Sequence, residues 1–523
     1  MAAQRGSLAS ATVLVSALAA VSTVIGLGRD VVIAGVFGSG AALDAYFLAL
    51  GLMNVVLGLL AGGVVKASVP VFARQSAGAA DDAPLAVSRT ASIALSGLLV
   101  VLGAASLLVY VAAAPLTGWV GPGFDSEQSA LAVRLTRVLL VAVVLVAATN
   151  LLAAVAQAHR RFFWSAAEGV PFNLVMIAAA AGFGPRYGVT ALAVGFVAGS
   201  ALRLACQLPA LRGLGLRIRP ALRWDDPGAR QIAHVLPPLL LGSAVTNVNT
   251  LVDRAVGSLV DEGVISSLSY GWRLTSLADT LVTVSLVTVA YPAFGAAAAR
   301  PAELARLLDR SLRTVVTVLL PVVAVLMVAS QPVVALVYER GSFSSQDTST
   351  TATAVLFYAP AVLFIAWREL VVRASYALAD TRRPVAVAVL AMVLNVIGDL
   401  TLGRHFGIAG LAASTTLAVL VAAAANSWWL ARHHGIGGIA AVAGSLWRVG
   451  GAGAGCAGAL AVAVAVAPDP GTSTVGRLGL VMAVALIAGI SYWIGLVLLR
   501  APERALVGYT LALVAGRFTR AGR

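Results

Sequence analysis

Charged residues interrupt long apolar stretches at several points in this sequence. The stretch "GLGRDVVIAG", residues 26–35, carries Arg29 and Asp30 side by side, and "LVDRAV", residues 251–256, carries Asp253 and Arg254. Further charges of this kind are Asp44, Lys66, Arg273, Asp279 and Asp399. A charge at membrane depth is costly, so such residues usually face a partner or a water-filled cavity. They are therefore the first candidates for chemistry.

Two of these residues are arginines in separate halves of the chain, Arg29 and Arg273. A guanidinium group can donate two parallel hydrogen bonds to a phosphate group, so a cavity lined by both arginines suits a phosphate or diphosphate. For the adjacent pairs Arg29–Asp30 and Asp253–Arg254, the alternative is local charge compensation. Because buried ion pairs can often be replaced by apolar residues without loss of stability, we favour a functional role.

A second group of polar residues suits a cation. Asn395 and Asp399 are four residues apart, so they share one face of a helix. Asp253 and Thr415 lie on other predicted spans and could converge on this face. Carboxylate, amide and hydroxyl oxygens are hard ligands that suit a small hard cation. The alternative is a hydrogen-bonded contact between packed helices, and the residue types alone leave both interpretations open.

The elements that carry these residues are predicted membrane spans. Of the 523 residues, 60% are hydrophobic and 11% are charged, whereas soluble globular proteins carry about 25% charged residues. A helix crosses a bilayer with about 20 mostly apolar residues. Fourteen stretches meet this requirement: 9–36, 43–72, 91–113, 133–157, 163–183, 187–209, 230–257, 266–295, 311–338, 350–378, 384–403, 407–431, 446–467 and 475–499.

The basic residues between the spans predict the orientation of the chain. Arginines are frequent in the loops on the side of the N-terminus, for example Arg160, Arg161, Arg382 and Arg383, and rare in the other loops. Cytoplasmic loops carry such an excess of positive charge, so both termini are expected in the cytoplasm. The net charge of +14 is spread over these loops and forms no nucleic-acid-binding patch.

The chain also repeats itself. At an offset of 222, Pro70 matches Pro292 and Asn173 matches Asn395. Six spans per repeat is an even number, so the halves are parallel repeats, an arrangement typical of transporters with a central cavity. The sequence predicts an all-α polytopic membrane protein of about 14 helices: two six-helix parallel repeats and two further C-terminal helices. The expected domains are an N-terminal lobe at 1–210, a C-terminal lobe at 211–435, and a last pair of spans with a cytoplasmic tail at 436–523.

Several motifs resemble one transporter family. The stretch "GLGRDVVIAGVFGSGAALDAYFLALGLMN" at 26–54 is similar to the first two spans of the MurJ (MviN) lipid II flippases, which belong to the multidrug/oligosaccharidyl-lipid/polysaccharide exporter superfamily. The likeness continues through "SYGWRLTSLADTLVTVSLVTVAYP" at 269–292, "LVYERGSFSSQDT" at 336–348 and "YALADTRRPVAVAVLAMVLNVIGD" at 376–399. It covers nearly the whole chain, and the family's fourteen spans agree with the number counted above.

The resemblance implies roles for particular residues. Arg29 and Arg273 match arginines that line the family's central cavity and engage the pyrophosphate of the substrate. Asp30, Asp44 and Asn54 match polar positions of the same blocks. Lys66 and Arg254 are further candidates for substrate binding because their charges lie within predicted spans. A sodium site of some members implies Asp253, Asn395, Asp399, the backbone of Leu411, and Thr415. The last two spans would supply a groove for the isoprenoid tail.

The sequence departs from the family pattern at positions of the cavity. Thr23 and the pair Leu57–Gly58 stand where the family has arginines, and Gly62 stands where it has a glutamate. Lys66, on the same predicted span as Leu57, could replace part of the lost positive charge. The losses raise the alternative that the substrate is a different polyprenyl-linked glycan.

The sequence therefore predicts a flippase that carries a polyprenyl-diphosphate-linked cell-wall precursor from the inner to the outer leaflet of a bacterial plasma membrane. We expect alternating access, coupled to Na⁺ or to the membrane potential, in a monomer without any other cofactor. No catalytic motif is present, so no enzyme is expected. Two other functions are a cation-coupled drug exporter and a transport-inactive scaffold that recruits cell-wall synthesis enzymes. The arginines disfavour the first, because its substrates are often cationic.

Overall fold

The computed structural model describes residues 2–61, 63–77, 83–221, 225–437, 439–468, 471 and 473–504. Within these ranges the chain forms α-helices and two short π-helices, and no strand. Eleven helical stretches among the described residues are long and apolar enough to cross a membrane. The prediction of an all-α, multi-pass membrane protein is confirmed.

By its internal contacts the chain divides into two compact units, and unit 1 comprises Met1–Ser266 and Arg340–Phe343. Its core helix is α6 (Ser126–Ala158), which contacts α2, α3, α4 and α10 and buries Leu135, Leu139 and Val143. The helices of unit 1 besides α6 are α1 (Ala2–Phe37), α2 (Ala41–Ala61), α3 (Val64–Ser76), α4 (Ala83–Val111), α5 (Ala113–Val120), α7 (Phe162–Ala167), α8 (Gly169–Ala178), the π-helix η1 (Ala179–Phe183), α9 (Gly184–Tyr187), α10 (Thr190–Leu211) and α11 (Pro227–Ser258).

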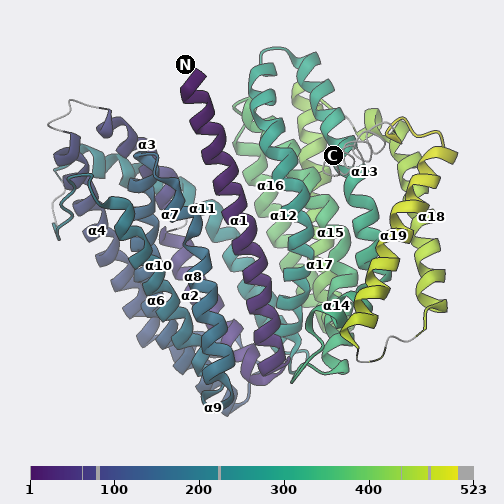
Figure 1. The fold of residues 1–523 in the computed structure, drawn as a ribbon, viewed down its shortest axis with the longest axis horizontal. Helices are drawn as coiled ribbons and strands as arrows, with labels where there is room; N and C mark the ends of the chain where they lie inside the picture. The colour runs from purple at the N-terminus through teal and green to yellow at the C-terminus, as the bar shows by residue number, and fades with distance from the viewer. Residues whose placement is uncertain are drawn as a thin grey trace, which may run out of the picture. The chain divides into compact units, whose positions relative to one another are not determined.

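Unit 2 comprises Ser267–Glu339 and Ser344–Arg523. Its central helix is α15 (Ser345–Ala377), which contacts α13, α14 and α17. The remaining helices are α12 (Val264–Ala297), whose first residues belong to unit 1, α13 (Pro301–Val328), α14 (Ser330–Tyr338), α16 (Arg382–Gly398), the π-helix η2 (Asp399–Gly403), α17 (Arg404–His434), α18 (Ile439–Val466) and α19 (Thr474–Leu498). Figure 1 shows α18 and α19 side by side.

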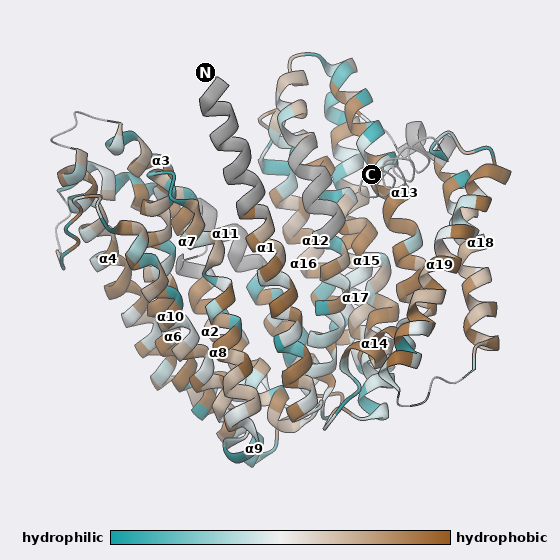
Figure 2. Cartoon of the chain, in the orientation of Figure 1, coloured by the Kyte–Doolittle hydropathy of each residue, from teal (hydrophilic) through white to brown (hydrophobic). Residues whose placement is uncertain are grey.

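The distribution of hydropathy follows from a bilayer environment. Hydrophobic residues cover most of α19, whereas hydrophilic residues are found at the short helix α9 (Figure 2). Large apolar side chains are also exposed along the spans, for example Leu108 on α4 and Met482 on α19, which are 70% and 64% exposed. In water such surfaces would be unfavourable, but in lipid they need no partner.

Backbone features support the internal repeat. The π-helices η1 and η2 begin at Ala179 and Asp399, an offset of 220. Each is followed by a glycine with positive φ, Gly188 at 58° and Gly407 at 59°, an offset of 219. An α-helix that is interrupted by a π-turn and a left-handed glycine is unusual, so its recurrence at this spacing is a structural sign of the repeat.

Residues 217–221, between α10 and α11, are not helical and lie along α4. The hydroxyl groups of Ser88, Ser92 and Ser96 accept hydrogen bonds of 2.9, 3.0 and 2.9 Å from the backbone N–H groups of Arg217, Arg219 and Ala221, respectively. Serines four apart on a helix are separated by about 6 Å, close to the spacing of alternate residues in an extended chain. This match explains how three serines can bind alternate residues of the segment.

This segment leads α11 into unit 1. Asp226 caps the start of α11 by accepting a 2.8 Å hydrogen bond from Ala229 N, and it also accepts 2.8 Å from Thr90 Oγ1 of α4. The contacts of α11 therefore lie in unit 1, although the predicted boundary at residue 210 assigns this helix to the second lobe. The assignment of lobes by internal repeat stays a prediction.

Candidate functional site

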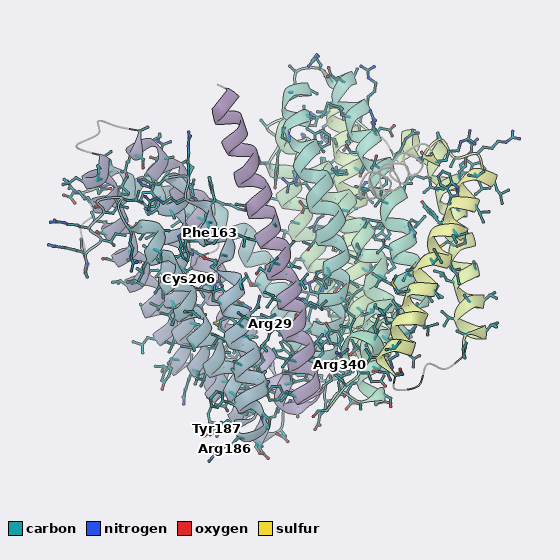
Figure 3. The ribbon with its side chains drawn as sticks, viewed as in Figure 1. Arg29, Phe163, Arg186, Tyr187, Cys206 and Arg340 are labelled. Atoms are coloured by element: carbon teal, nitrogen blue, oxygen red, sulfur yellow. The ribbon has the colours of Figure 1, made fainter. Side chains whose placement is uncertain are left out.

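Arg29 lies on α1 and forms a polar cluster inside unit 1 (Figure 3). Its Nε and Nη2 donate to Asp30 Oδ1 at 2.9 and 2.7 Å, and its Nη1 donates to Asn173 Oδ1 at 3.2 Å. The side chains of Arg29 and Asp30 are 21% and 12% exposed. Because a guanidinium group has five N–H donors, this arrangement orients Arg29 and leaves donors for an anionic ligand.

Sequence reasoning did not identify Asn173 as the partner of Arg29. Its Nδ2 also donates to the backbone oxygen of Ser22 at 3.2 Å, which ties α8 to α1. The two helices approach so closely at Gly169 that a Cβ there would overlap the Ser22 hydroxyl group. The only available signal was the match of Asn173 to Asn395 in the repeat.

Asp44 is 1% exposed and has a clear structural role. Its Oδ2 accepts a 2.8 Å hydrogen bond from Gly263 N, and its Oδ1 accepts 2.7 Å from Ser266 N. Both oxygens therefore cap the beginning of α12, where the helix dipole also favours a negative charge. A direct role of Asp44 in substrate binding stays a prediction.

Arg254 on α11 packs against Gly51 of α2, where a Cβ would overlap its guanidinium group. In the same way, a Cβ at Gly58 would overlap the side chain of Asn247. Gly51 and Gly58 are seven residues apart on α2, and they leave room for Arg254 and Asn247, which are seven residues apart on α11. This packing gives a physical reason for glycine at position 58, where the family resemblance implies an arginine nearby.

The remaining predicted substrate residues are not brought into the Arg29 cluster by any contact that the structure describes. Asn54 on α2 and Lys66 on α3 are exposed. Arg273 is partly exposed and lies on α12 in unit 2, whereas Arg29 lies in unit 1. That Arg29 and Arg273 face each other stays a prediction.

Unit 2 contains a buried polar cluster at the start of η2. Asp399 is 0% exposed and accepts a 2.8 Å hydrogen bond from Asn395 Nδ2. Ser414 Oγ lies within hydrogen-bond distance of Asp399 Oδ1 and 2.8 Å from the backbone oxygen of Leu411. Thr415 Oγ1 donates to the same Leu411 oxygen at 3.3 Å. Four of the five predicted sodium ligands therefore lie in one cluster.

The donor types in this cluster fit a small hard cation. They are carboxylate, amide, backbone carbonyl and hydroxyl oxygens. The cluster also lies at a π-turn, and such turns are frequent at functional sites. Among the described residues no group of three His, Cys, Asp or Glu side chains could hold a metal ion. Sequence reasoning missed Ser414 and named its neighbour Thr415. Asp253 lies in unit 1, so its convergence on the cluster stays a prediction.

A hydrophobic groove lies between α18 and α19. It has a volume of about 650 Å³ and is lined by residues including Val462, Val466, Ala483 and Ile487. At the start of α19, Arg477 Nη2 donates to Glu339 Oε1 at 2.7 Å and Arg477 Nη1 to the Glu339 backbone oxygen at 3.1 Å. These bonds fasten α19 to the end of α14, and sequence reasoning did not identify them.

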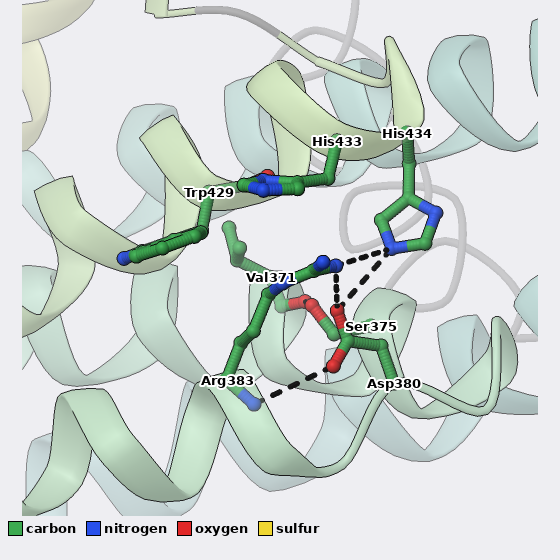
Figure 4. Close-up of polar contacts among 7 residues, drawn as sticks. All are labelled: Val371, Ser375, Asp380, Arg383, Trp429, His433 and His434. Carbon is green, nitrogen blue, oxygen red and sulfur yellow. Dashed lines mark hydrogen bonds and ion pairs between the residues drawn. The ribbon is translucent and has the colours of Figure 1, made fainter.

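A second polar cluster in unit 2 joins the turn after α15 to the end of α17 (Figure 4). Arg383 Nη1 donates to Asp380 Oδ2 at 2.7 Å, and His434 Nε2 lies 3.2 Å from the same oxygen. The guanidinium of Arg383 also lies over the ring of Trp429 at 5.7 Å. Burial raises the pKa of the Asp380 carboxyl, but the hydrogen bonds from His434 and Arg383 outweigh it and lower that pKa.

Comparison with known proteins identifies relatives over most of the chain. Residues 33–494 match the family model described as "Lipid II flippase MurJ". A protein of Vibrio cholerae serotype O1 named "Probable lipid II flippase MurJ" is 28% identical over 420 residues, which cover 78% of this chain and 80% of that protein. "Lipid II flippase MurJ" of Burkholderia cenocepacia is 28% identical over 437 residues, or 80% and 82% of the two chains.

Solved structures share the fold. The structure titled "Lipid II flippase MurJ, inward closed conformation" matches with a TM-score of 0.77 at 21% identity, over 93% of this chain and 100% of that chain. An inward-facing multidrug transporter of the MATE family and MOP superfamily matches with a TM-score of 0.65 at 15% identity, over 79% and 94% of the two chains. These relatives are named as flippases and transporters.

Proposed function

Because this chain belongs to the MurJ family of lipid II flippases, we propose that it moves a lipid II-like, polyprenyl-diphosphate-linked cell-wall precursor from the inner to the outer leaflet of a bacterial plasma membrane. The family match over residues 33–494 supports the class of reaction. The observation that carries the substrate chemistry is the Arg29 cluster, in which Asp30 and Asn173 orient a guanidinium group within a membrane span. Such a group suits a diphosphate.

The proposed mechanism is alternating access. Arg29 and Arg273 hold the diphosphate in a cavity that opens first to the cytoplasm and then to the exterior. The apolar groove between α18 and α19 suits the isoprenoid tail, because its lining offers hydrocarbon contacts. Both termini are cytoplasmic, as the distribution of loop arginines predicts, and the transporter acts as a monomer.

The proposed coupling ion is Na⁺. Asn395, Asp399, the Leu411 carbonyl and Thr415 of unit 2 would hold it together with Asp253. When bound, the ion would neutralise the charge of the Asp399 carboxylate, which is 0% exposed. Ion binding in this cluster would then favour one of the two transport states.

A second candidate substrate is another polyprenyl-linked glycan. It is favoured by Thr23, which replaces a cavity arginine of the family and whose hydroxyl donates to its own helix at Ala19 O, 2.9 Å. With threonine at this position, the cavity has fewer positively charged side chains than the family pattern implies. A drug exporter is disfavoured by the arginines, and a transport-inactive scaffold is tested by the same experiment as the flippase.

The test is lipid II translocation by the purified full chain in vesicles. We expect the parent protein to translocate lipid II, Arg29→Ala to abolish transport, and Arg29→Lys to keep only part of it, since lysine retains the charge but loses the guanidinium fork. Arg186→Ala is a matched control, because this exposed arginine lies beside Tyr187 away from the Arg29 cluster (Figure 3). Transport by Arg29→Ala at the parent rate would overturn the diphosphate role of Arg29.

A further inference from the structure

Two arginines near the beginning of α6 have no acidic partner among the residues that the structure describes. Arg134 and Arg137 are eight and eleven residues after Ser126, the first residue of α6, or about 12 and 17 Å along the helix axis. Because they are three residues apart, they share one face of the helix. Two neighbouring guanidinium groups therefore keep their positive charge on this face, and sequence reasoning did not identify them.

Tyr110, next to the last residue of α4, holds Arg137 in place. The Arg137 Nε donates to the backbone oxygen of Tyr110 at 3.4 Å, and the guanidinium carbon lies 5.0 Å from the centroid of the Tyr110 ring. A guanidinium group has five N–H donors, so these contacts leave both Nη atoms able to bind a ligand. Arg137 is thus oriented by an aromatic ring and a carbonyl group, neither of which cancels its charge.

The surface around these arginines is apolar and exposed. Leu107 and Val111 on α4 are 63% and 71% exposed, and Val141, one turn after Arg137 on α6, is 55% exposed. Arg134 itself is exposed and Arg137 is partly exposed. The two helices are neighbours in unit 1 (Figure 1). Since exposed apolar side chains of a span meet lipid, we expect this face of α4 and α6 to be covered by phospholipid.

The arginines lie at the membrane interface that we predict to be external. Tyr110 is near the end of the predicted span 91–113, and Arg134 and Arg137 are near the beginning of the predicted span 133–157. The external ends of spans carry few arginines, so two neighbouring ones need a specific reason. Long cationic side chains at an interface extend towards the lipid headgroups, where phosphate groups supply negative charge.

From this geometry we propose that Arg134 and Arg137 bind the phosphate group of an anionic phospholipid in the outer leaflet. Phosphate fits because each guanidinium can donate two parallel hydrogen bonds to its oxygens. Phosphatidylglycerol should bind more tightly than phosphatidylcholine, whose choline group offsets the phosphate charge. The site lies on other helices than the Arg29 cluster, and it does not depend on the proposed flippase function.

The test is thermal unfolding of the purified full chain in a non-ionic detergent with added dioctanoylphosphatidylglycerol. The lipid should raise the Tm of the parent protein, and the double variant Arg134→Gln/Arg137→Gln should bind it at least tenfold more weakly, as expected when hydrogen bonds to a charged group are lost. Arg186→Gln is the matched control, because Arg186 is also exposed and lies over a tyrosine ring, that of Tyr187, at 5.6 Å.

Variants of Tyr110 test how Arg137 is held. Tyr110→Phe should bind the lipid like the parent protein, because it keeps the ring and the backbone carbonyl, whereas Tyr110→Leu should bind it about threefold more weakly, because it removes the ring. Equal binding by Tyr110→Leu and the parent would overturn this role of the ring.

Three further probes identify the ligand. Dioctanoylglycerol, dioctanoylphosphatidylcholine and inorganic phosphate should each raise the Tm of the parent protein less than dioctanoylphosphatidylglycerol does. An equal rise with dioctanoylglycerol or dioctanoylphosphatidylcholine would show that the acyl chains or any headgroup suffice, and an equal rise with inorganic phosphate would show a site for free anions. Each of these results would overturn the proposal, as would unchanged binding in the double variant or an equal loss in Arg186→Gln.

Discussion

Asp44 Oδ1 on α2 accepts a 2.7 Å hydrogen bond from the backbone N–H of Ser266 in the first turn of α12. Asp44 also accepts a hydrogen bond from Gly263 N, so one buried carboxylate satisfies two backbone N–H groups at the start of α12. An intramembrane acid that the family resemblance assigns to the substrate thus performs a structural task in this chain. Stability and transport measurements can separate the two roles.

We expect Asp44→Ala to lower the free energy of unfolding by about 1–2 kcal/mol, as the loss of a helix cap does. Asp44→Asn should lower it less, because the amide keeps one accepting oxygen. Thermal unfolding in detergent measures both. If the two variants are as stable as the parent but fail to transport, the cap is unimportant and Asp44 acts on the substrate.

Asn173 should act on transport through Arg29. Asn173→Leu removes the acceptor for Arg29 Nη1 and should lower lipid II transport per folded molecule about tenfold, whereas Asn173→Asp should restore most of the activity. Asn426→Leu is the matched control, since Asn426 is similarly buried but donates only within its own helix, to Ala422 O. Equal losses in Asn173→Leu and Asn426→Leu would mean that the first acts only through folding.

The sequence predicts the helices and the repeat well because both depend on local composition. The length of each apolar stretch defines a span. The match of Asn173 to Asn395 in sequence is accompanied by a match in backbone structure, because η1 and η2 follow these residues at similar positions. A difference is the predicted span 43–72, which the structure divides into α2 and α3. Apolar composition continues across that break, so length alone could not reveal it.

Contacts between helices could not be predicted in the same way. Glu168, in the turn between α7 and α8, and Arg203 on α10 are 35 residues apart and form an ion pair of 2.5 Å. Nothing in their local sequence shows that they meet. Similarly, Ser414 and Thr415 are adjacent on a helix but point about 100° apart, so spacing could not decide which hydroxyl reaches Asp399.

The orientation of the chain can be tested by reporter fusions. Fusions after Arg89, Arg161, Arg219 and Arg383 should report the cytoplasm, and fusions near Asp125 and Ser345 should report the exterior. The physical reason is the excess of arginine in the loops of the first group. An external signal at Arg219 or Arg383 would contradict the predicted fourteen spans.

Asp380 makes the stability of unit 2 depend on acid pH. The pKa of its carboxyl is lowered in the folded protein, so the folded state binds this proton more weakly than the unfolded state does. Its stabilising effect is therefore complete above the ordinary aspartate pKa of about 3.9 and is lost as the pH falls through the lower folded value. Asp380→Asn should be less stable than the parent at pH 7, and the difference should shrink between pH 4 and pH 3. A constant difference over this range in thermal unfolding would exclude an ionic role.

The sodium proposal predicts ion-specific stabilisation. Na⁺ at about 100 times its Kd would stabilise the folded state by about 2.7 kcal/mol, whereas K⁺ or choline at equal ionic strength would do less. Asp399→Asn should abolish the Na⁺-dependent rise in Tm, because it removes the charged ligand, and Asp253→Asn should reduce it if α11 contributes a ligand. Thr401→Ala is the control: Thr401 lies in η2 but is exposed, and its hydroxyl donates to its own helix at Ile397 O, 2.7 Å. A Na⁺-dependent rise that persists unchanged in Asp399→Asn would place the ion elsewhere, and the buried cluster of Asn395, Asp399 and Ser414 would then be a helix-packing contact.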